Sequence, residues 1–175
     1  MRRWVFVLSA AALLVVACGR DVQPEAAAEP TRWDPCNITP EQIAATGLDP
    51  DYRDEGWDEG IKADDWARCS FKPPGVDVAY HLSVRSSLLH TFSSVRQDSL
   101  AYSLRDVRVA DRDAFVYQRS AGESLNPCSI GLDVPPGVVV FTVSYFVSSG
   151  DKSDPCARVL KHASDLQTAL PPVAK

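Results

Sequence analysis

Five cysteines are the residues of this chain whose positions most clearly indicate chemistry. Cys18 directly follows Val15-Val16-Ala17. Before it come Arg2, Arg3 and an apolar run of about 13 residues, shorter than the roughly 20 that a membrane-spanning helix needs. This is the layout of a secretory signal. A cysteine at the cleavage point is typical of lipoproteins, because its thiol receives a diacylglycerol before cleavage. We therefore predict a signal peptide over residues 1–17 and lipidation of Cys18.

The other cysteines, Cys36, Cys69, Cys128 and Cys156, predict two structural disulfides, because an even number in an exported domain indicates pairing. Their long spacings argue against a zinc site or a thioredoxin-type redox pair. Sequential pairing, Cys36 with Cys69 and Cys128 with Cys156, is favoured because it closes local loops. A bond between Cys36 and Cys156 is the alternative. These two lie near predicted helix starts, which stabilise a thiolate, but an oxidising compartment favours disulfides over free thiols.

No residue pattern indicates catalysis. A nucleophile needs a neighbouring base, yet Ser129 and Ser149 lie in no G-x-S-x-G frame. The three histidines, His81, His90 and His162, stand singly, without the pairwise spacing of metal ligands. We therefore predict no catalytic residues, no metal site and no cofactor, and we expect a protein that is not an enzyme.

The acidic segment over residues 49–65 suggests a calcium loop but does not match one. An EF-hand loop needs oxygen ligands at alternating early positions, glycine at the sixth and glutamate at the twelfth. Gly56 fits the glycine position, but Arg53 and Lys62 stand where oxygen ligands are required. We interpret the segment as a solvated loop with its aromatic side chains turned inward, and a cation site of another type is the alternative.

The charge of the chain excludes some partners. The formal net charge is -5, and removal of Arg2 and Arg3 with the signal peptide lowers it by two, to -7. An acidic protein without a basic cluster is a poor ligand for nucleic acid, because phosphates must be neutralised by Lys and Arg. Electrostatic docking on anionic lipid is disfavoured for the same reason. We expect a monomer held at the membrane by acyl chains on Cys18.

Three helices are predicted beyond a flexible tether over residues 18–32. In the first, Thr39 is the N-cap and Gly47 the stop. Apolar residues at helical spacing predict a second helix over residues 87–104. The third begins after the N-cap Asp154 and extends to Leu170, before two prolines.

Strands fill the intervals between these helices. Strict alternation over residues 76–85 predicts a strand with one buried face. Further strands are predicted at 69–71, at 107–109 and 114–117 as a hairpin or as one strand broken by a bulge, from Cys128 to 134, and at 138–147. The order predicts a single α+β domain over residues 33–172. Its antiparallel sheet has about five to six strands, with helices packed on it, and two disulfides staple it.

A frame of short motifs carries a family resemblance. It comprises Asp34-Pro35-Cys36, Trp66-x-x-Cys69, Cys128-Ser129-Ile130 and Asp154-Pro155-Cys156. With the lipidation motif and tether, this frame resembles a family of actinobacterial, mycobacterial-type cell-envelope lipoproteins that carry a domain of unknown function. The resemblance spans residues 33–171, departing at Phe71, where tryptophan is commoner in the family. It implies location and architecture and supplies no activity or catalytic residues.

These observations lead to a functional hypothesis. We expect a lipoprotein anchored on the extracytoplasmic face of the cell membrane that binds a lipid, a small molecule or an envelope protein. The first alternative is a structural or assembly factor of the cell envelope, motivated by the aromatic and acidic loop from Tyr52 to Trp66. The second is an envelope hydrolase, which requires a Ser or Cys within hydrogen-bond reach of a His.

Overall fold

The computed structural model describes residues 30–57, 61, 63–120, 125–151 and 153–172. The predicted signal peptide, most of the predicted tether and the predicted lipidation site Cys18 lie outside these residues. No helix in the described ranges has the length and apolar character that a membrane crossing requires.

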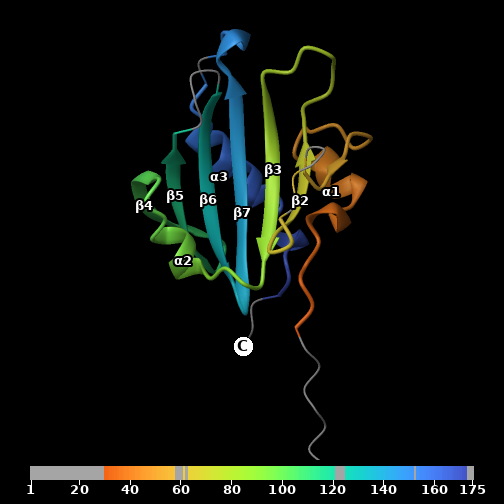
Figure 1. Ribbon diagram of the computed structural model, residues 1–175. Coiled ribbons are helices and arrows are strands. Elements are labelled where there is room, and N and C mark those ends of the chain that lie inside the picture. The colour runs from red at the N-terminus through yellow and green to blue at the C-terminus, as the bar shows by residue number, and fades with distance from the viewer. Residues whose placement is uncertain (1–29, 58–60, 62, 121–124, 152, 173–175) are drawn as a thin grey trace, which may run out of the picture.

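One antiparallel sheet of seven strands forms the centre of the molecule, in the order β1-β2-β3-β7-β6-β5-β4 (Figure 1). The strands are β1 (Asp54–Glu55), β2 (Ala67–Phe71), β3 (Tyr80–Ser87), β4 (Ala101–Val109), β5 (Arg112–Arg119), β6 (Leu125–Val134) and β7 (Gly137–Phe146). The helices are α1 (Pro40–Ala45), α2 (Phe92–Arg96) and α3 (Pro155–Asp165), with 3-10 turns η1 (Pro35–Asn37), η2 (Val147–Ser149) and η3 (Gln167–Ala169). The antiparallel sheet is confirmed, but the prediction of five to six strands was too low. The molecule is mostly sheet.

Helix α3 covers one face of the sheet, which we call the inner face (Figure 1). Alternate residues of each central strand point toward it, such as Leu82 and Val84 of β3. From the helix, Val159, Ala163 and Leu166 pack into the same apolar cluster. Each buried side chain of this size contributes about 1.5–3 kcal/mol relative to an exposed one. The inner face is therefore the main core of the domain.

The helix ends follow local sequence rules. The Thr39 side chain accepts a hydrogen bond from the Gln42 N–H, and the Gln42 side chain accepts one from the Thr39 N–H, so the predicted capping box forms. Gly47 adopts a positive φ of 81°, which suits a helix stop. Asp154 caps α3 as predicted, but α3 ends at Asp165, and the short turn η3 replaces the expected last turn.

The helix predicted over residues 87–104 is wrong. Thr91 caps the short helix α2, which ends at Arg96. The Asp98 side chain then accepts a hydrogen bond from the Leu100 N–H, 2.9 Å away, and this turn sends the chain into β4. Hydrogen bonding of β4 along β5 overrides the helical spacing of the apolar residues.

Both disulfides join the inner face of the sheet to a segment outside it. Cys36 of η1 is bonded to Cys69 of β2, and Cys128 of β6 is bonded to Cys156 of α3. This is the sequential pairing favoured by the sequence. Cys36 and Cys156 lie at the starts of helical segments, and neither is a free thiol.

We expect each disulfide to stabilise the fold by about 3.5 kcal/mol, from the loop-closure entropy of separations of 33 and 28 residues. Replacing Cys36 and Cys69 together by Ala, or Cys128 and Cys156 together, should lower the free energy of unfolding by that amount in urea denaturation. Non-reducing peptide mapping checks the pairing. A crosslinked peptide holding Cys36 and Cys156 would contradict the structure.

A buried histidine gives the fold a pH dependence. The His162 Nε2 atom lies 3.0 Å from the Tyr80 hydroxyl oxygen, inside the core. Burial, together with the charges of Lys161 and Arg158, lowers the pKa of His162 from 6.5 to about 4. As the pH falls below 6.5, the unfolded chain binds a proton that the folded chain excludes until about pH 4. The stability that depends on a neutral His162 is therefore lost across this range.

The variant His162→Gln does not titrate and serves as the reference. The unfolding free energy of wild type minus that of the variant should fall by about 3 kcal/mol between pH 7 and pH 4. Carboxylates titrate in both proteins, so their contributions cancel in the difference. Urea denaturation at a series of pH values provides the measurement, and a difference that is constant with pH would argue against the buried neutral state.

Candidate functional site

The face of the sheet opposite α3, which we call the outer face, carries a row of hydroxyl groups. Cα pairing places Ser70, Ser83, Thr142, Ser129 and Tyr117 side by side on β2, β3, β7, β6 and β5. We call these five residues the hydroxyl row. Two of its members, Ser129 and Thr142, hydrogen-bond each other through oxygens 2.8 Å apart. The row forms a polar floor across five strands of a sheet whose other face is apolar.

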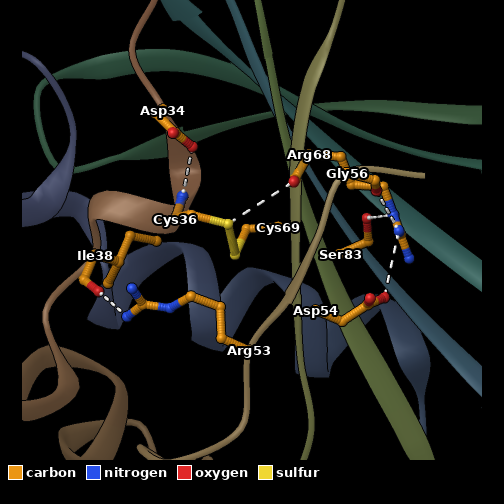
Figure 2. Close-up of a disulfide and its surroundings, with 9 residues drawn as sticks. All are labelled: Asp34, Cys36, Ile38, Arg53, Asp54, Gly56, Arg68, Cys69 and Ser83. Carbon is orange, nitrogen blue, oxygen red and sulfur yellow. Dashed lines mark hydrogen bonds and ion pairs between the residues drawn. A yellow bond between two sulfur atoms is a disulfide. The ribbon is translucent and has the colours of Figure 1, made fainter. Parts of the chain in front are cut away.

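Arg68 of β2 lies at one end of this floor and is held by several partners (Figure 2). Its guanidinium donates to the Gly56 carbonyl oxygen at 2.6 Å and to the Ser83 hydroxyl at 3.3 Å. The Asp54 carboxylate is 3.5 Å away. The guanidinium also lies 5.6 Å from the centre of the Trp57 ring. The Trp57 ring therefore lies beside the hydroxyl row and bounds the space above it.

Arg85 of β3 and Arg119 of β5 lie on the same face. Arg119 is paired with Asp98 at 3.1 Å. The Arg85 guanidinium lies 5.2 Å from the centre of the Trp66 ring, and no described carboxylate lies within ion-pair distance of it. Burial lowers the pKa of Arg85, and nearby Arg119 acts in the same direction. Arg85 nevertheless keeps its charge at neutral pH, as arginine side chains do.

Two adjoining cavities lie over this surface, and Arg85 and Arg119 line both. The first is about 360 Å³, with Trp57 and members of the hydroxyl row in its lining. The second is about 290 Å³, with Trp66 and apolar Val140 among its lining residues. We call the two together the arginine groove. Cavities of about 300–1,000 Å³ are of the size that holds small ligands.

Two buried polar atoms at this face lack a hydrogen-bond partner among the described residues. They are the indole Nε1 of Trp57 and the hydroxyl oxygen of Ser70. The indole N–H can only donate, so its natural partner is an acceptor. A buried unpaired donor costs about 1–3 kcal/mol. Trp57 lines the groove, so this donor without a described acceptor lies beside it.

A larger cavity, of about 500 Å³, lies between α2 and strands β4 and β5. Its charged side chains are already matched with one another. Arg96 is paired with Asp106, and Arg108 is paired with Asp113 at 2.7 Å. Because these charges neutralise each other, this cavity is a weaker candidate than the arginine groove.

The histidines singled out in the sequence lie apart from one another. His162 is in the core, and His81 lies against the Phe146 ring, with ring centres 5.3 Å apart. The His90 Nε2 atom is 2.5 Å from a carboxylate oxygen of Asp65, and this hydrogen bond lowers the pKa of Asp65. Within the described residues, no histidine is hydrogen-bonded to a serine or a cysteine. The pair that the hydrolase alternative requires is therefore not found among the described residues.

The predicted acidic loop turns its aromatic side chains toward basic residues. Tyr52 lies 4.9 Å from the Lys72 ammonium, just as Trp57 and Trp66 contact arginines. Among the residues that the structure describes, no three His, Cys, Asp or Glu side chains gather as metal ligands. The arginines of the groove carried no functional assignment in the sequence. Their only signal was that Arg85 lies at a polar position of an alternating strand.

Two buried serines provide a matched test of the hydroxyl row. Ser70 is buried without a described partner, whereas the buried Ser86 donates its hydroxyl to the Trp33 carbonyl. We expect Ser86→Ala to lower the unfolding free energy by about 1 kcal/mol, and Ser70→Ala to leave it unchanged or raise it. Urea denaturation of both variants measures the difference. Equal losses in the two would mean that Ser70 has a partner in the free protein.

Comparison with known proteins gives one match. A family model described as "Protein of unknown function (DUF3558)" matches residues 13–168. No curated protein and no solved structure matches the chain. The expectation of a family with a domain of unknown function is confirmed. The match covers most of the 175 residues, and the chain therefore belongs to the DUF3558 family of proteins of unknown function.

Proposed function

We propose that this protein is a lipoprotein of an actinobacterial cell envelope whose domain binds a small ligand in the arginine groove. The observation that carries the proposal is that two side chains lining that groove lack partners among the described residues. Arg85 is charged and partly buried without a described carboxylate, and Trp57 has a buried N–H without a described acceptor. A ligand that bound there would supply partners for both.

Two observations support the proposed location. Val15-Val16-Ala17-Cys18 has the order of a lipoprotein cleavage site, so acyl chains on Cys18 would hold the domain at the extracytoplasmic face of the membrane. The disulfides Cys36–Cys69 and Cys128–Cys156 suit an oxidising compartment, because cytosolic thiols are kept reduced.

The polarity of the outer face supports a binding role. Antiparallel sheets with one solvated face are common, but such a face needs neither a groove nor guanidinium groups set among aromatic rings. Here Trp57 and Trp66 cover two arginines and form the walls of the groove. A rigid sheet floor holds polar groups in fixed positions, which lowers the entropic cost of binding.

The alternative role in envelope assembly rested on the loop from Tyr52 to Trp66 as a protein-contact surface. Its three aromatic side chains are occupied by contacts with Lys72, Arg68 and Arg85. Trp57 and Trp66 therefore help to build the groove, and a ligand site accounts for their positions better than a protruding contact surface.

A cavity-filling variant tests the proposal. Ser144 lines the groove, and Ser144→Trp should fill it. Native mass spectrometry of the full chain, purified in detergent from its own host, should show a bound molecule in the wild type that is lost in this variant. Ser164→Trp, on the exposed surface of α3, is the matched control and should retain the ligand.

Circular dichroism should show that both tryptophan variants are folded. Bare wild-type protein, together with no thermal shift on addition of a panel of lipids and small metabolites, would contradict the ligand-binding role.

A further inference from the structure

We infer that the arginine groove recognises a phosphate group, held by Arg85 in the cavity walled by Trp57. The inference rests on the proposed function and adds the chemical class of the ligand.

The balance of charge in the groove favours an anion. Arg68 and Arg119 each have a carboxylate, Asp54 at 3.5 Å and Asp98 at 3.1 Å. Among described residues, Arg85 has no such partner, so the described side chains leave one positive charge of the groove unmatched. Partial burial removes water from this charge and strengthens its attraction to an anion.

The hydrogen-bonding groups favour a ligand rich in acceptors. Arg85 and the Trp57 indole can only donate, and the hydroxyls of Ser83, Thr142 and Ser144 can rotate to donate as well. No carboxylate side chain stands in the described lining of this 360 Å³ cavity. A neutral ligand rich in donors would leave Arg85 and the indole unpaired.

The directions of these donors favour a tetrahedral anion over a planar carboxylate. Arg85, Ser83 and Thr142 line the cavity from the sheet, whereas Trp57 lines it from the loop that follows β1. A phosphate presents at least three oxygens in different directions and accepts bidentate hydrogen bonds from arginine. A carboxylate presents two oxygens in one plane and would reach fewer of these donors.

The adjoining cavity suggests that the phosphate belongs to an ester. This 290 Å³ space is lined in part by Trp66, Val95 and Val140, and Arg85 stands between it and the phosphate cavity. It has room for an organic group attached to the phosphate. A lipid headgroup and a soluble phosphate ester share this chemistry, and the probes below separate them.

The test is isothermal titration calorimetry on the full chain in a non-ionic detergent. The phosphate probes are inorganic phosphate, glycerol 3-phosphate and dihexanoyl phosphatidic acid, and the reference probes are acetate, glycerol and dihexanoylglycerol. We expect saturable binding of at least one phosphate probe. Tighter binding of phosphatidic acid indicates a lipid headgroup, and equal binding of glycerol 3-phosphate indicates a soluble ester.

The variants assign this binding to the groove. Arg85→Gln should raise the Kd of the bound phosphate probe by about tenfold or more, since it removes a charged hydrogen-bond donor. Arg105→Gln removes the same charge from the exposed surface of β4 and should change the Kd less than about twofold. Trp57→Phe keeps an aromatic ring and removes the N–H, so it should raise the Kd by about threefold to tenfold. If Arg85→Gln fails to fold, the Kd measured for Trp57→Phe shows whether the phosphate probe binds in the groove.

The outcomes separate this inference from the proposed function. If only acetate or a neutral probe binds, and Ser144→Trp abolishes that binding, the ligand-binding role stands and the phosphate inference falls. If a phosphate probe binds equally to wild type, Arg85→Gln and Trp57→Phe, the inference also falls. If no probe binds and native mass spectrometry shows only bare protein, both fall.

Discussion

The two-residue alternation of antiparallel strands is the constraint on which the structure depends. Successive side chains point to opposite faces, so a shift of one residue in register would exchange the faces of a strand. Arg68 and Ser70 flank Cys69, which faces the core, and Ser129 follows the core residue Cys128. The disulfide partners of these cysteines lie on the inner side, so both bonds also hold the neighbouring outer-face residues in place.

The open outer face follows from the unequal lengths of the helices that cover the sheet. Helix α3 packs along β6 and β7 on the inner face. On the outer face, α2 covers only part of the sheet, where Phe92 packs edge-on against Phe115 with ring centres 5.0 Å apart. Beyond α2, aromatic rings from loops cover the arginines. A guanidinium covered by an aromatic ring attracts an anion more strongly than one in water, because less solvent screens its charge.

Local rules predicted some parts of this structure and missed others. Helix starts at Thr39 and Asp154 follow from nearby residues. The strand predicted over residues 76–85 forms only from Tyr80 to Ser87, and Val76 is exposed, because the turn after β2 extends further than the alternation indicated. The helix over 87–104 failed because pairing of β4 with β5 depends on residues outside that window. The groove was missed for the same reason. Arg68, Arg85 and Arg119 meet only through the register of distant strands, and no pairwise spacing in the chain encodes that contact.

The one-sided cover of the sheet has a consequence for how this domain can change. Most buried apolar residues point toward α3, a smaller apolar cluster around Phe115 and Val140 lies on the outer face, and most residues of the arginine groove point away from α3. Mutations at separate sites without shared partners have nearly additive effects on stability. Polar outer-face side chains away from this smaller cluster can therefore be exchanged while the core stays intact. The sheet separates the main core from the groove. Ligand specificity could therefore be altered by substitutions at polar groove positions, without redesign of the inner-face core.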